Sequence, residues 1–265
     1  MSFINLIFKN LNAQELLNEI FKSKKVFDEK GKEYTLNSGI DEKEGEFIKE
    51  IIRKYKPIKT IEVGCAYGIS SLYICSSIEK NKGCSHTIID PFQKSNCNNI
   101  GIYNLQRLGY DFFELIEKPS EIALPELLSS GQKYDLGLID GWHTFDHTLI
   151  DFFYLNRLIN IGGIIIIDDI GLPSIKKLMR YILNYPCFEL VGHVEVKKSR
   201  KRELYNLITN FPFRLLSKLF PNRLKYKYFS SNIIKSDKEL NLKSSMIALR
   251  KVQEDERNWN WFKEF

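Results

Sequence analysis

The chain has 265 residues, of which 43% are hydrophobic and 27% charged, and its formal net charge is +6 at pH 7. This composition argues against a disordered chain, and the length permits one large α/β domain. No run approaches the ~18–20 apolar residues that span a bilayer. The five cysteines are scattered, odd in number and without a Cys-x-x-Cys pair, so they suggest neither a disulfide framework nor a structural zinc site. A reducing cytoplasm fits best.

Residues 1–57 are predicted to form a helical flank. The first seventeen residues indicate an amphipathic helix, since their short apolar stretch is interrupted by Asn and Lys and no small-residue cleavage site follows. Asp41 to Tyr55 is a second predicted helix, which starts at polar residues and carries Ile48 and Ile52 on one face.

Residues 58–195 alternate short β-branched runs with longer helical patterns, which is typical of βαβ units around a parallel sheet. Strands are predicted at Lys59–Val63, Thr87–Asp90, Phe112–Ile116, Leu136–Asp140, Gly163–Asp168 and Phe188–Val194, and helices at Ser70–Glu79, Asn99–Leu108, Ser120–Ser129, Asp146–Asn160 and Ser174–Leu183. Continuous apolar runs such as Ile164–Ile167 indicate strands that are covered on both faces.

The C-terminal part divides into two predicted segments. Residues 243–265 are predicted to hold the last strand, at Ser244–Leu249, and a tail; residues 196–242 are a basic, aromatic insertion or cap. Within the insertion, 210–229 mixes apolar and basic residues. It is interpreted as a substrate-covering cap or a helix packed on the core, because insertions between late strands commonly shape pockets. A peripheral membrane helix and a nucleic-acid surface stay open as less favoured alternatives.

The first core strand leads into a glycine-containing turn with the pattern Glu62-x-Gly64-x-x-x-Gly68-x-Ser70. Such a turn brings backbone close to a ligand at the carboxyl edge of the sheet, and the pattern lacks the tighter G-x-G-x-x-G of dinucleotide sites. Asp90 ends the next strand, where a carboxylate can accept two ribose hydroxyls. The alternative is an ordinary tight connection of an α/β protein. The combination with Asp90 favours a nucleoside-containing ligand.

Three carboxylates are predicted to meet at the same edge. Asp140 ends one strand, and Asp168 and Asp169 end the next. Unpaired carboxylates at close range raise one another's pKa, and a cation removes that conflict. Hard oxygen ligands suit Mg²⁺, so these three residues are the candidate metal ligands.

Four motifs occur in order along the chain: Ile61–Ser70, Ile88–Pro91, Tyr134–His143 and Gly162–Asp169. Together they resemble class I S-adenosylmethionine-dependent methyltransferases, and within that class the catechol O-methyltransferase-like branch that includes sugar and macrolide O-methyltransferases. The resemblance covers roughly residues 38 to 195 and the last strand. It implies a Rossmann-like, doubly wound, mostly parallel seven-stranded sheet with helices on both faces.

The resemblance also implies roles for single residues. The methionine end of S-adenosylmethionine is expected at Glu62, Gly64, Gly68 and Ser70, the ribose at Asp90, and the adenine edge at the loop that holds Ser120. Asp140 is assigned to both the cofactor and the metal. Members of the family hold a metal at the positions of Asp140, Asp168 and Asp169, the last of which is often Asn there.

His143 is the candidate general base. A hydroxyl is a poor nucleophile until its proton is removed, and the family places a Lys or His base at this position. The structural alternative is a loop histidine that donates to a carboxylate or caps the following helix. Asp146 is expected to begin that helix, and Asp151 is interpreted as structural.

The main hypothesis is therefore a cytoplasmic, cation-assisted O-methyltransferase that uses S-adenosylmethionine and acts on a hydroxyl of a sugar, glycan or small metabolite. Two alternatives stay open. One is an RNA methyltransferase, which the basic insertion motivates and which is the less favoured partner class. The other is a non-catalytic S-adenosylmethionine-binding or scaffold protein. A homo-oligomer is compatible with the sequence, as is membrane-peripheral placement through 210–229.

Overall fold

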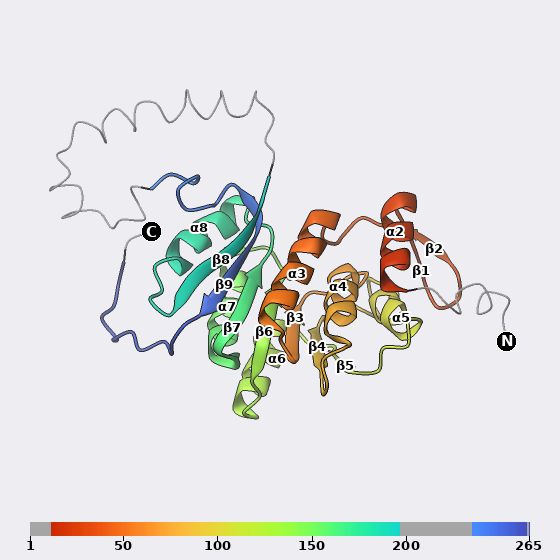
Figure 1. Cartoon of the computed structure of the whole chain (residues 1–265), viewed down its shortest axis with the longest axis horizontal. Coiled ribbons are helices and arrows are strands. Elements are labelled where there is room, and N and C mark those ends of the chain that lie inside the picture. Colours follow the sequence, from red (N-terminus) through yellow and green to blue (C-terminus); the bar gives the residue numbers. More distant parts are fainter. Residues whose placement is uncertain (1–11, 197–234, 264) are drawn as a thin grey trace, which may run out of the picture.

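A seven-stranded sheet forms the centre of the computed structural model, which describes residues 12–196, 235–263 and 265. Its strands are β3 (Lys59–Val63), β4 (Ser85–Ile89), β5 (Phe113–Ile116), β6 (Tyr134–Ile139), β7 (Ile159–Ile167), β8 (Phe188–Glu195) and β9 (Ser244–Lys251). Their order across the sheet is β5-β4-β3-β6-β7-β9-β8 (Figure 1). The first five are parallel, and β9 runs antiparallel to both of its neighbours. The predicted Rossmann-like sheet is confirmed.

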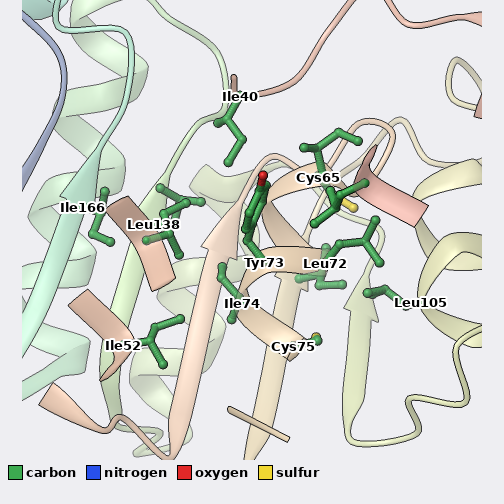
Figure 2. Close-up of a cluster of buried hydrophobic side chains, with 14 of the residues drawn as sticks. Ile40, Ile52, Cys65, Leu72, Tyr73, Ile74, Cys75, Leu105, Leu138 and Ile166 are labelled. Carbon is green, nitrogen blue, oxygen red and sulfur yellow. The ribbon is translucent and has the colours of Figure 1, made fainter. Parts of the chain in front are cut away.

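Helices cover both faces of this sheet. One face carries α3 (Glu42–Tyr55), α4 (Ile69–Ile78) and α5 (Ile100–Gln106); the other carries α6 (Ser120–Ser129), α7 (Phe145–Leu158) and α8 (Pro173–Ile182). Each face has its own cluster of buried hydrophobic side chains, the first under α3–α5 and the second under α6–α8. Because side chains alternate along a strand, Ile164 and Ile166 of β7 lie in the first cluster, and Ile165 and Ile167 lie in the second. Figure 2 shows part of the first cluster, where Leu138 and Ile166 of the sheet face the helices.

The N-terminal flank contains more than helices. It begins in the described region with α2 (Ala13–Ser23), continues through an antiparallel hairpin of β1 (Lys25–Phe27) and β2 (Glu33–Thr35), and ends with α3. The hairpin is not predicted from the sequence, because strands of three residues carry too little alternation to be recognised. Helix α3 starts as expected, with Asp41 and Glu44 forming a reciprocal capping box.

The element ends agree with the predicted ones to within a few residues, and β7 differs most. Its predicted start is Gly163, whereas the strand begins at Ile159, directly after α7 ends at Leu158. Ile159 pairs with Tyr134 of β6 before the register shifts, so an irregular ladder lengthens the strand. The segment 210–229 lies outside the described residues. Within the described residues, no helix has both the length and the apolar character needed to cross a membrane.

Candidate functional site

The glycine turn after β3 is built by two positions that exclude any side chain. Gly64 has φ +89°, and a Cβ there would lie 2.0 Å from the carbonyl oxygen of Asp140. Gly68 has φ +78°, precedes α4, and leaves room for the backbone of Gly101 at the start of α5. Both glycines are therefore required by backbone conformation and by close approach within the protein.

Asp90 holds this turn from the end of β4. It is buried, and its Oδ2 accepts hydrogen bonds from the backbone N–H groups of Cys65 (3.1 Å) and Ala66 (2.9 Å) and from the Gln93 amide (2.9 Å). Among the described residues, its Oδ1 accepts only the N–H of Phe92, at 2.8 Å. Because a carboxylate oxygen has two lone pairs, Oδ1 retains capacity for one further donor.

Glu62 and Ser70 lie behind the turn. The Glu62 side chain is completely buried, and it accepts hydrogen bonds from the hydroxyls of Ser70 (2.9 Å) and Ser71. Ser70 is itself only 3% exposed. Glu62 is therefore engaged with its own chain instead of facing the open edge, and its direct contact with the amino group of the cofactor stays a prediction.

The acidic side chains predicted at the ends of β6 and β7 do come together. The Asp140 and Asp168 carboxyls lie against each other. Burial, followed by the charges of Asp168 and Asp169, raises the pKa of Asp140 well above its ordinary value. Burial, with the nearby Glu44 carboxylate next, raises the pKa of Asp168 to about 8. Asp168 Oδ1 has no hydrogen-bond partner among the described residues.

His143 joins this group from the loop after β6. Its Nε2 lies 3.3 Å from Asp169 Oδ2 and 3.9 Å from Asp140 Oδ1, and its side chain is 37% exposed. One ligand atom from each of these three residues lies within 4.8 Å of the others. Asp169 reaches this position with φ +56°, a left-handed conformation that Asp tolerates better than most residues. His143 thus has one side toward carboxylates and one toward solvent.

Two contacts hold the loop that carries His143 where it meets α7. The Ser174 hydroxyl at the start of α8 donates to the His143 carbonyl at 3.0 Å. Thr144 is the N-cap of α7, and its hydroxyl accepts from the His147 N–H. Asp146, expected to begin this helix, lies in its first turn. These contacts hold the base candidate on a defined loop.

Asp151 of α7 is a carboxylate whose environment the sequence does not reveal. It is 1% exposed, its side chain interacts with that of Ser120, and its Oδ2 would lie 3.7 Å from a Cβ at Gly141. Burial raises the pKa of Asp151 to about 6, and the Ser120 hydrogen bond opposes the rise. Ser120, predicted at the adenine edge, is thereby linked to the loop after β6.

The structure thus brings Asp140, His143, Asp168 and Asp169 together at one edge and places the glycine turn and Asp90 beside them. Residues that the sequence analysis does not assign to the site are Ser71, His86 and Gln93. Ser71 lies next to the predicted Ser70, whereas His86 requires the strand register, because it pairs with Thr60 across β3 and β4.

Comparisons with known proteins agree with this arrangement. Residues 61–170 match a family model described as a methyltransferase domain. No curated protein matches the chain. Among the solved structures that share the fold, three have 13–15% identity to this chain. The O-methyltransferase TomG from Streptomyces achromogenes, in complex with SAM, has 13% identity and a TM-score of 0.55, with 72% of this chain and 89% of that chain covered.

Cofactor-bound Rv0187 from MTB has 15% identity and a TM-score of 0.54, with coverage of 69% of this chain and 83% of that chain. An O-methyltransferase from Bacillus cereus in complex with SAH has 15% identity and a TM-score of 0.53, with coverage of 60% and 77%. Identities this low establish the fold, and the family model establishes the domain. Residues 61–170 therefore form a methyltransferase domain, and the described chain has the Rossmann-like fold that the sequence motifs imply.

Proposed function

We propose that this methyltransferase uses S-adenosylmethionine to methylate a hydroxyl of a sugar, glycan or other small metabolite, with the assistance of a divalent cation. The observation that carries the proposal is the convergence of Asp140, His143 and Asp169 beside the glycine turn. One edge of the sheet thereby combines a turn suited to a nucleoside cofactor with carboxylates and a solvent-accessible imidazole.

The cofactor assignment rests on the turn and on Asp90. TomG and the Bacillus cereus enzyme are described in complex with SAM and SAH, respectively, and they share this fold. In this chain, Asp90 Oδ1 accepts a single N–H from the described residues and can accept one ribose hydroxyl in addition. Gly64 and Gly68 allow the left-handed backbone and the close packing against Asp140 and Gly101 that give the turn its shape.

The cation assignment rests on the acidic group. Asp140 and Asp168 are largely enclosed and have raised pKa values, and Asp168 Oδ1 lacks a partner among the described residues. Buried carboxylates are stable when a proton, a donor or a cation compensates them. Asp140 and Asp169 offer ligand oxygens within 4.8 Å of each other and of His143, and the Asp168 carboxyl lies against Asp140. Carboxylate oxygens are the ligands that Mg²⁺ prefers, and this ion keeps open positions for water or substrate.

His143 is assigned the proton transfer. When bound, S-adenosylmethionine supplies an electrophilic methyl group, and a divalent cation lowers the pKa of an acceptor hydroxyl. His143 accepts the hydroxyl proton at Nδ1, because Nε2 faces Asp169 at 3.3 Å and carries the proton that this carboxylate accepts. Asp169 orients the ring and stabilises the imidazolium that results. The partial exposure of His143 lets an acceptor reach it from solvent.

Calorimetry with S-adenosylmethionine tests the cofactor, and transfer of a labelled methyl group to a set of hydroxylated acceptors, with Mg²⁺ or with EDTA, tests the reaction. We expect binding, and transfer only with the cation. His143→Ala should reduce transfer by about 10²-fold or more while leaving cofactor affinity unchanged. His193→Ala, a change on β8, is the matched control and should leave both unchanged. Absence of cofactor binding by the wild-type chain contradicts the proposal.

RNA is the competing acceptor. Its support is the basic insertion at 196–242, most of which lies outside the described residues. Methyl transfer to RNA with steeply salt-dependent binding, and none to small hydroxylated acceptors, would replace the small-molecule proposal.

A further inference from the structure

A buried polar cluster lies directly behind the glycine turn, between α4 and the strands β3 and β4. Its side chains belong to Thr60, Glu62, Ser70, Ser71 and His86, and none of these residues is more than 3% exposed. Glu62 and His86 are completely buried. Burying ionisable groups is costly unless they are paired and hydrogen-bonded, so each contact in this cluster affects the stability of the turn.

Glu62 is the acceptor at the centre of the cluster. Its Oε2 accepts from Ser70 at 2.9 Å, and its Oε1 accepts from Ser71. These two serines lie in the first turn of α4, which follows Gly68 without any side-chain cap. The Glu62 carboxylate therefore connects the start of α4 to β3.

His86 supplies the third contact. Its Nε2 lies 3.3 Å from Glu62 Oε1 and has no hydrogen-bond partner among the described residues. On the other side of the ring, Nδ1 lies 2.9 Å from Thr60 Oγ1. Because an ionised carboxylate only accepts hydrogen bonds, a lone pair on Nε2 would be repelled by Oε1 at this distance. The contact is attractive when Nε2 carries a proton, in which case Nδ1 of a neutral ring accepts from the Thr60 hydroxyl.

We propose that His86 is a positioning residue for the cofactor turn. Its Nε2–H holds the Glu62 carboxylate, and Glu62 in turn fixes the hydroxyls of Ser70 and Ser71. The proposal rests on the proposed function, because the turn is the candidate cofactor site. It assigns Glu62 a role behind the turn, and it makes His86 act on the cofactor through Glu62 and the two serines.

The contact with Glu62 can be removed and restored. His86→Leu keeps a buried side chain without a donor, and it should weaken S-adenosylmethionine binding in calorimetry by about tenfold to a hundredfold, as expected for a small displacement of binding groups. His86→Gln places an amide N–H near the position of Nε2 and should restore affinity to within about threefold. Thr87→Val is the control, since Thr87 is a buried hydroxyl of the same strand that faces Glu114. It should leave the affinity unchanged.

Nuclear magnetic resonance of ¹⁵N-histidine-labelled protein tests the ring directly, without ligand. The chain has four histidines, and the His86→Gln spectrum assigns the signal by its absence. We expect a protonated Nε2. An unprotonated Nε2 overturns the proposal even if His86→Leu fails to fold, and so does a folded His86→Leu with wild-type affinity. If wild-type protein binds no S-adenosylmethionine, the proposed function fails while the Nε2 measurement still tests the cluster.

Discussion

The two halves of the candidate site differ in how their carboxylates are compensated. On the β3–β4 side, Glu62 and Asp90 are buried and accept hydrogen bonds from hydroxyl, amide and backbone donors of the chain itself. On the β6–β7 side, Asp140 and Asp168 lie against each other with raised pKa values. The carboxylates of the β3–β4 side, the cofactor half, are therefore compensated by the chain before a ligand binds. Those of the β6–β7 side, the acidic half, require a proton or a cation.

This difference follows from the chemistry that each half is proposed to perform. A turn that binds a cofactor benefits from groups that are held in place before binding, because ordering them afterwards would cost affinity. A cation site instead needs carboxylates that the protein leaves uncompensated. Substitutions in the two halves should therefore act in opposite directions.

The largest effect is expected from Gly64→Ala, which breaks the cofactor half. The new Cβ would meet the Asp140 carbonyl oxygen at 2.0 Å in a left-handed conformation, so the backbone has to move. We expect a loss of about 3 kcal/mol or more in the free energy of unfolding, and loss of S-adenosylmethionine binding. Gly83→Ala is the control, with φ +75° and open space around it, and should cost about 1 kcal/mol. Equal effects of both substitutions in denaturant titrations would contradict the account.

Asp151 of α7 is a further buried carboxyl with a raised pKa, and its effect on stability can be measured separately from that of Asp140 and Asp168. Its folded pKa of about 6 is raised by burial from 3.8, so its contribution to stability is present below pH 4 and is lost as pH rises through about 6. Asp151→Asn should therefore be more stable than wild type at pH 8, by at most ~3 kcal/mol, and equally stable at pH 4. Asp146→Asn on the same helix should lose stability above pH 4, because a Thr144 hydrogen bond lowers the Asp146 pKa. Thermal or denaturant unfolding as a function of pH measures both.

Asp90→Asn and Asp168→Asn compare the two halves directly in EDTA. The amide introduced at position 90 has one oxygen, so its NH2 group faces either the N–H donors of the turn or the N–H of Phe92, and we expect a loss of about 1–3 kcal/mol. Asp168→Asn removes a carboxyl whose pKa is raised to about 8 by burial. The variant should be at least as stable as wild type at pH 8. A marked loss of stability in both variants would show that Asp168 is compensated by the protein.

The smallest effect is a cation-dependent shift in melting temperature. Asp168 titrates near pH 8 in the folded chain, so a cation competes with a proton below that pH. At tenfold saturation, Mg²⁺ should raise the melting temperature by about 3–5 °C at pH 8.5, and by less at pH 6. Asp168→Asn should abolish the shift. A shift that does not depend on pH or on Asp168 would place the cation elsewhere.

Much of the fold could be predicted because apolar runs, glycines and strand-end carboxylates are local signals. The strand Lys59–Val63 and the meeting of Asp140 with Asp169 follow from such patterns. The enclosure of Glu62 could not be predicted, because it depends on the register that sets His86 beside Thr60 and on the serines of the next helix. The hydrogen bond from the Cys65 N–H to the Asp90 side chain could not be predicted either, because it depends on the backbone conformation of the turn.

The most direct test of the central claim is methyl transfer from labelled S-adenosylmethionine to hydroxylated acceptors, measured with Mg²⁺, with EDTA, and after Mg²⁺ is restored. The account predicts transfer with Mg²⁺, loss in EDTA, and recovery when the cation returns. Full transfer in EDTA would contradict the role of the acidic group.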